Sequence, residues 1–113
     1  MLGLAFKENI RDIRNSKTVD IVRELEDSGV QARVHDPLVL PQDAEREYGI
    51  RLSSVDELAA SDGVILVVAH RVFCESGRDW MRSLLRRSSR GVVMDVKSVF
   101  RPEDFPEAAY WRL

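Results

Sequence analysis

Short apolar runs alternate with amphipathic segments along the chain. The most apolar run, Val64 to Ala69, is too short for a helix and predicts a central strand. Residues 16–28 carry apolar side chains at helical spacing, and Gly29 follows them as a natural helix terminator. The other segments, interpreted in the same way, predict strands over 2–6, 30–35, 92–96 and 109–113, an extended piece over 50–52, and helices over 41–48, 54–60 and 78–87.

This alternation predicts the fold class. Strands joined through helices form parallel sheets with helices on both faces, so we expect a single α/β domain with a three-layer, doubly wound, Rossmann-like fold and a mostly parallel sheet. Val30, Ala32 and Val34 alternate with polar residues, which favours an edge position for that strand. Ser54 and Glu57 have the spacing of a capping box and predict the start of a helix.

A charged loop follows the first predicted strand. Asn15 and Ser16 at its end are residue types that cap a helix. The carboxyl end of a strand in an open α/β sheet is where ligands bind, and a helix N-terminus suits phosphate. A surface loop whose basic residues pair with Glu8 and Asp12 explains the same spacing equally well. The basic residues of this loop are Lys7, Arg11 and Arg14.

Composition narrows the range of partners. The 113 residues include 17 basic and 19 acidic side chains, a net charge of −2, so we expect neither nucleic acid nor a membrane as a partner. No apolar run approaches the length of a membrane span. A single cysteine cannot form an internal disulfide, which fits a reducing compartment. We expect a cytoplasmic protein with one compact core.

Three other residues could carry chemistry. His70 ends the central strand on the ligand-binding edge, where it either contacts a ligand or is a hydrogen-bonded structural histidine, and we favour the second. Asp36 ends another strand and could hold a ribose, but the chain has no G-x-G-x-x-G motif, so a turn before Pro37 is the better interpretation. Cys74 lies four residues from His70, but no further Cys or His is near, and we expect no metal site.

Several motifs together resemble one family. The segment GLAFKENIRDIRNS resembles the opening of the C-terminal, UDP-binding domain of the UDP-glucose/GDP-mannose dehydrogenase family, whose pattern is G-x-x-[FY]-K followed by D-x-R-x-[ST]. The forms DIRN, VAH and DVK resemble most the branch that oxidises UDP-N-acetylhexosamines. The residues that match the pattern are Gly3, Phe6, Lys7, Asp12, Arg14 and Ser16.

The resemblance implies a function for a longer protein. Members of this branch use NAD to oxidise the C6 alcohol of a UDP-N-acetylhexosamine to the uronic acid for surface polysaccharide synthesis. The NAD loop and the nucleophilic cysteine lie in segments that precede this domain. Residues 1–113 would then be a fragment that binds UDP-sugar and holds no catalytic residue, taken from an enzyme that is a homo-oligomer. A stand-alone nucleotide-sugar-binding or interaction module without catalysis is the alternative.

The resemblance also implies binding roles. Phe6 and Lys7 match the pair that contacts the UDP-sugar, and Arg14 matches the arginine that reaches toward NAD. Lys97 stands where the UDP-glucose enzymes carry a substrate-contacting arginine. Lysine keeps the charge without the bidentate fork, which argues against UDP-glucose as the substrate.

Overall fold

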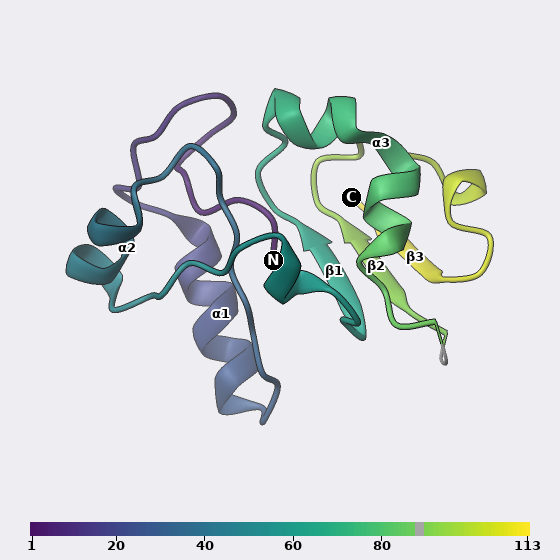
Figure 1. Cartoon of the computed structure of the whole chain (residues 1–113), viewed down its shortest axis with the longest axis horizontal. Helices are drawn as coiled ribbons and strands as arrows, with labels where there is room; N and C mark the ends of the chain where they lie inside the picture. Colours follow the sequence, from purple (N-terminus) through teal and green to yellow (C-terminus); the bar gives the residue numbers. More distant parts are fainter. Residues whose placement is uncertain (88–89) are drawn as a thin grey trace.

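The computed structural model describes residues 1–87 and 90–113. Figure 1 shows the three strands side by side with α3 at one end of the molecule, while α1 and α2 lie toward the other end. The elements are α1 (Lys17–Asp27), α2 (Pro41–Tyr48), η1 (Asp56–Leu58), β1 (Gly63–Leu66), α3 (Arg71–Ser83), β2 (Val92–Asp95), η2 (Pro102–Asp104) and β3 (Ala109–Arg112), where η marks a 3-10 helix. Among these described residues, no helix has both the length and the apolar character needed to cross a membrane.

The sheet is parallel and continues beyond its regular strands. β1 pairs with β2 and β2 with β3, all in parallel. Single parallel bridges extend this order, because Leu2 pairs with both Leu66 and His35, and Val34 pairs with Leu52. Numbered along the chain, the six extended segments lie in the order 3-2-1-4-5-6, which is that of a doubly wound dinucleotide-binding fold. The predicted fold class is therefore confirmed.

The order of the strands reverses between Leu2 and β1. At such a switch point the connections leave in opposite directions, and a crevice opens at the carboxyl ends of the two strands. Gly3 makes their close approach possible: it has φ +103°, and a Cβ at this position would lie 2.5 Å from Val68 Cβ. A side chain at position 3 would force the two strand ends apart.

Some predicted strands are wrong in extent or position. Of the predicted strand 2–6, only Leu2 pairs with neighbouring strands, because the chain turns at Gly3 and the N–H groups of Leu4 and Ala5 bond to a side chain instead. The segment predicted as an edge strand is bridged on both sides, at Val34 and His35, so the edge position is also wrong.

The predicted helices agree better with the structure than the predicted strands do. α1 and α2 lie where the sequence predicts them, and the capping box is formed, with Ser54 N–H donating to Glu57 Oε1 at 3.1 Å and Glu57 N–H to Ser54 Oγ at 3.4 Å. The helix that follows is only the 3-10 turn η1. α3 begins at Arg71, seven residues before the predicted start. Gly77 (φ +78°) interrupts this helix just before residue 78, and the half that precedes Gly77 was not predicted.

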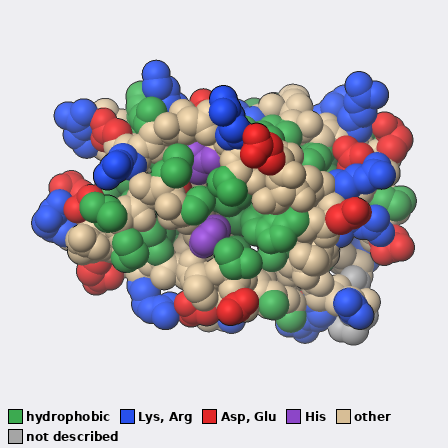
Figure 2. Space-filling model, turned by 45° about the horizontal axis from the view of Figure 1, so that its top comes forward, with side chains coloured by type: hydrophobic (Ala, Val, Ile, Leu, Met, Phe, Trp, Pro, Cys, Tyr) green, Lys and Arg blue, Asp and Glu red, His purple; other side chains and the backbone are tan. Residues whose placement is uncertain are grey.

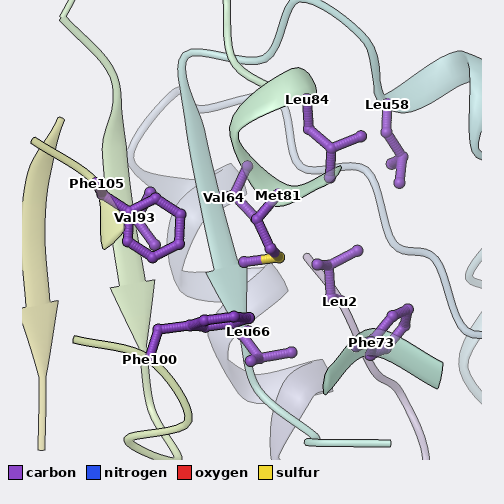
Figure 3. Packing of buried hydrophobic residues seen from close by; sticks show 10 residues of the cluster. All are labelled: Leu2, Leu58, Val64, Leu66, Phe73, Met81, Leu84, Val93, Phe100 and Phe105. Carbon is purple, nitrogen blue, oxygen red and sulfur yellow. The ribbon is translucent and has the colours of Figure 1, made fainter. Parts of the chain in front are cut away.

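Two hydrophobic clusters hold these elements together. The first lies between α3 and one face of the β1–β2 pair, where Val64, Leu66 and Val93 point the same way (Figure 3). The second packs α1 and α2 against the segments around Leu4 and Val34. Each cluster fixes one side of the switch point, so the loops at the carboxyl edge start from rigid bases.

Candidate functional site

Loops from four segments meet at the carboxyl edge of the sheet, the upper edge in Figure 1. Figure 2 turns this edge toward the viewer: the histidine side chains lie near the middle of the face among hydrophobic side chains, and most basic side chains lie toward its rim. The four loops follow Leu2, His35, β1 and β2 and cover residues 3–16, 36–40, 67–70 and 96–101. The site is therefore built from loops that follow neighbouring parallel segments of the sheet.

Asp36 is the anchor beneath these loops. Its carboxylate Oδ2 accepts hydrogen bonds from Leu4 N–H at 2.7 Å, from Ala5 N–H at 2.9 Å and from His70 Nε2 at 2.9 Å. Its Oδ1 accepts from Leu38 N–H at 2.9 Å. The side chain is fully buried, and these donors satisfy its charge without a cation.

The pKa of Asp36 reflects two opposing effects. Burial by itself raises the pKa of a carboxyl group, but the hydrogen bonds from His70 and from the N–H groups of Leu4, Ala5 and Leu38 outweigh it. The net result is a pKa below the usual range for aspartate. Asp36 is therefore an anion at neutral pH.

His70 connects Asp36 to the first loop. Its ring is fully buried, and its Nδ1 accepts a hydrogen bond from Asn9 N–H at 2.9 Å. A backbone amide can only donate, so Nδ1 carries no proton and the proton on Nε2 donates to Asp36. The Asn9 side chain in turn accepts from Arg71 N–H at 2.7 Å, at the first turn of α3. Three segments distant in sequence are thus joined.

These contacts decide the sequence hypotheses for both residues. His70 is a hydrogen-bonded structural histidine, as favoured, and the Leu38–Asp36 bond forms the predicted turn before Pro37. The bonds of Asp36 to Leu4 and Ala5 were missed, because they join residues more than thirty positions apart. Asn9 was missed as well, although asparagine is one of the few residue types that adopt a positive φ readily, here +63°.

Cys74 takes no part in this cluster. Its thiol is exposed and lies 3.8 Å from the carbonyl oxygen of Ala69, and burial of part of the side chain raises its pKa. A thiol with a raised pKa is a poor nucleophile. Within residues 1–87 and 90–113, no group of three or more His, Cys, Asp or Glu side chains could hold a metal ion.

Phe6 and Lys7 are exposed near the start of the first loop. Phe6 N–H donates to the carbonyl oxygen of Asp12 at 2.6 Å, which closes the loop behind them. The Phe6 side chain is 54% exposed, unusual for an aromatic residue. An apolar ring and an ammonium group are thus presented together to solvent.

Lys97 comes from the loop after β2 and meets this first loop. Its Nζ lies 3.7 Å from Glu8 Oε1, and both side chains are partly exposed. Lys97 is therefore brought to the same edge as Phe6 and Lys7, although it is ninety residues away in sequence. An open cleft of about 420 Å³ lies beside the loop, lined by Asn9, Leu38, His70, Arg71, Val72 and Glu75.

Arg14 forms an ion pair with Asp12 of its own loop. Its guanidinium group forms a fork with the Asp12 carboxylate, with NH2 to Oδ2 at 2.6 Å and Nε to Oδ1 at 3.0 Å. This hydrogen bonding from Arg14 lowers the pKa of Asp12 to about 2. The Arg14 side chain is 82% exposed. The alternative of a surface loop with internal ion pairs therefore holds for Arg14 with Asp12, whereas Glu8 pairs with Lys97 from another loop.

Two features of residues 1–87 and 90–113 differ from those of a dinucleotide site. In such folds an acid at the end of the second strand holds a ribose. Asp36 stands at that place, but its carboxylate is buried and already bonded to four donors. The loop after Leu2 is also long and closed on itself by the bond between Phe6 and Asp12.

Comparisons with known proteins agree with one another. Residues 1–102 match the UDP binding domain of the UDP-glucose/GDP-mannose dehydrogenase family. A UDP-N-acetyl-D-glucosamine 6-dehydrogenase of Pseudomonas aeruginosa is 48% identical over 97 residues, which is 86% of this chain and 22% of that protein. An enzyme of the same name from Salmonella typhi is 34% identical over 103 residues, 91% of this chain and 24% of that protein.

A solved structure shares the fold. It is described as an NDP-N-acetyl-D-galactosaminuronic acid dehydrogenase from Methanosarcina mazei Go1, and it superposes on all of this chain with a TM-score of 0.81 at 22% identity. The match covers 23% of that protein. The chain thus spans about a quarter of the length of the proteins that it resembles.

Proposed function

The chain belongs to the UDP-glucose/GDP-mannose dehydrogenase family, and we propose from this that residues 1–113 are the UDP-sugar-binding domain of a UDP-N-acetylhexosamine 6-dehydrogenase. The longer protein would oxidise the C6 alcohol of the sugar to the uronic acid for surface polysaccharide synthesis. Relatives named as UDP-N-acetyl-D-glucosamine 6-dehydrogenases support this substrate class. We expect the enzyme to be a cytoplasmic homo-oligomer whose catalytic residues lie outside this domain.

The observation that carries the proposal is the meeting of two loops at the switch point. Phe6 and Lys7 are exposed on the first loop, and the contact of Lys97 with Glu8 brings a second ammonium group beside it. Two lysines and an aromatic ring suit a nucleotide sugar, since ammonium groups donate to diphosphate or sugar oxygens and a ring gives an apolar wall. In this proposal all three contact the UDP-sugar.

NAD takes up the hydride when it is bound. The sequence has no G-x-G-x-x-G motif, and the Asp36 carboxylate is already bonded within the domain, so we propose that NAD is held mainly by another part of the longer protein. Arg14 is the residue of this domain that we assign to NAD. Its exposed guanidinium fork, now closed on Asp12, can open toward pyrophosphate or ribose oxygens.

An amide NMR titration of this chain with UDP-N-acetylglucosamine tests the proposal, with NAD as the comparison. We expect saturable shifts over residues 3–16 and at Lys97. Lys7→Ala should weaken the UDP-sugar response, while Arg23→Ala, on the exposed side of α1, is the control and should leave it unchanged. Shifts that are spread evenly over the surface, or no shifts at millimolar ligand, would contradict this function.

Kinetic measurements on the longer protein separate the roles of Lys7 and Arg14. There, Lys7→Ala should raise the KM for UDP-sugar and Arg14→Ala the KM for NAD. The reverse pattern would overturn both assignments. A longer protein that binds UDP-sugar but reduces no NAD would favour the alternative, a binding module without catalysis.

A further inference from the structure

The buried side chain of His70 supports the exposed first loop, which carries Phe6 and Lys7. The His70 side chain is fully buried, and its Nδ1 receives the N–H of Asn9, which is two residues from Lys7. Asn9 has φ +63°, a left-handed conformation that few residue types adopt. The hydrogen bond to His70 and the bond from Arg71 N–H to Asn9 Oδ1 are what hold it.

The loop is thus fixed at two points. The bond between Phe6 N–H and the Asp12 carbonyl closes its base, and Asn9 ties its middle to His70 and to the start of α3. Glu8, between Lys7 and Asn9, reaches Lys97 on the other loop. Without the tie at Asn9, the tip of the loop would be free to move relative to Lys97.

We propose that His70, oriented by Asp36, is a positioning residue for UDP-sugar binding: it holds the loop that carries Phe6 and Lys7 in its ligand-binding conformation. The inference rests on the proposed function. A preformed loop binds more tightly because the cost of ordering it is met during folding and not during binding. Asp36 contributes by accepting the Nε2 proton, which keeps Nδ1 free to accept from Asn9.

Two substitutions separate positioning from simple stability. In His70→Gln the side-chain amide nitrogen replaces Nε2 and still donates to Asp36, but nothing accepts the N–H of Asn9. In His70→Asn the side-chain oxygen replaces Nδ1 and still accepts from Asn9, but the donor to Asp36 is lost. His35→Gln is the control, because the ring of this other histidine bonds through its Nδ1 to the Ser53 carbonyl at 2.8 Å.

The first measurement is the amide hydrogen exchange of Asn9, which needs no ligand. We expect the Asn9 amide to be protected in the unsubstituted protein and in His70→Asn, and to exchange faster in His70→Gln. Equal exchange rates in all three proteins would overturn the tie between His70 and the loop. This result stands whether or not the domain binds UDP-sugar.

The second measurement is the dissociation constant for UDP-N-acetylglucosamine from NMR titration, beside the melting temperature. His70→Gln should bind about fivefold more weakly while melting near the unsubstituted protein, since one hydrogen bond that orders the loop is lost. His70→Asn should melt lower yet bind within about twofold of the unsubstituted protein. If the affinity falls in proportion to the melting temperature in both variants, the positioning role of His70 is overturned. If the unsubstituted protein does not bind UDP-N-acetylglucosamine, the proposed function itself is refuted.

Discussion

Two buried carboxylates support the two loops of the site, and they do so over different distances in sequence. Asp36 bonds to Leu4, Ala5 and His70, all more than thirty residues away. Asp95, at the end of β2, accepts from Val99 N–H at 3.1 Å and Phe100 N–H at 2.7 Å, and from the Tyr110 hydroxyl at 2.6 Å.

The difference determines what each carboxylate does. The local bonds of Asp95 shape one loop, the loop that carries Lys97, and fasten it to β3. The distant bonds of Asp36 join the ends of three extended segments across the switch point. Loss of Asp95 should therefore disturb one loop, whereas loss of Asp36 should disturb the whole binding edge.

The largest expected effect is that of Asp36→Asn. The amide can accept from Leu4 and Ala5 only by turning its NH2 group toward the N–H of Leu38, so we expect a loss of about 3 kcal/mol in the free energy of unfolding. The melting temperature should fall by about 15 °C in thermal unfolding followed by circular dichroism. Asp62→Asn is the control, because Asp62 is exposed and its carboxylate pairs with Arg86 at 3.3 Å on the surface. Equal losses in both variants would contradict the anchor.

The same variant has an expected pH dependence. The pKa of Asp36 is lowered in the folded protein, so its stabilising contribution is present above the unfolded pKa of about 4 and is lost as the pH falls through the folded pKa. The stability difference between the unsubstituted protein and Asp36→Asn should therefore shrink in acid. Urea unfolding between neutral pH and pH 3 measures it, and a difference that stays constant would show that charge is not the cause.

Asp95→Asn should cost less, about 2 kcal/mol, since two of its three partners are neighbours in sequence. We expect its amide shift changes to stay within residues 95–101 and 109–112. Those of Asp36→Asn should spread over residues 3–9, 36–38 and 67–71. Two-dimensional NMR spectra measure these shift changes. If they spread over equally many residues in both variants, Asp36 and Asp95 do not differ in the way proposed.

Tyr110→Phe tests one bond of Asp95 through pH. Burial and the hydrogen bond to Asp95 raise the pKa of Tyr110, so the stabilising contribution of this bond is present in full below the unfolded pKa of about 10 and is lost as the pH rises from there through the folded pKa. Removal of the hydroxyl should cost about 1 kcal/mol at neutral pH. This cost should decrease above about pH 10, as measured by urea unfolding. A cost that is the same at all pH values would exclude titration of this hydroxyl.

The sequence predicted what local patterns encode. Apolar spacing located α1, Pro41 and Gly49 located the ends of α2, and the capping box at Ser54 was formed as predicted. The extent of the strand after Leu2 could not be predicted, because Gly3 and the acceptor at Asp36 divert a run that looks apolar throughout. The tie between His70 and Asn9 likewise depends on a contact across sixty-one residues, which no short-range pattern contains.

The variant with the smallest expected effect on stability, Glu8→Gln, lies where the two loops meet. Glu8 lies on the loop anchored through Asp36, and Lys97 on the loop anchored by Asp95. Because their pair is exposed and 3.7 Å long, Glu8→Gln should change the free energy of unfolding by less than about 0.5 kcal/mol.

Binding should respond more than stability does. Glu8→Gln removes a negative charge beside the proposed diphosphate contact and frees Lys97, so the affinity for UDP-N-acetylglucosamine should rise about threefold at low salt, and less at high salt. The matched control is Glu8→Gln combined with Lys97→Met, which should lose this gain. Weaker binding by Glu8→Gln would mean that Glu8 itself holds the sugar, and the two loops would then contribute an acceptor and a donor in place of two cations.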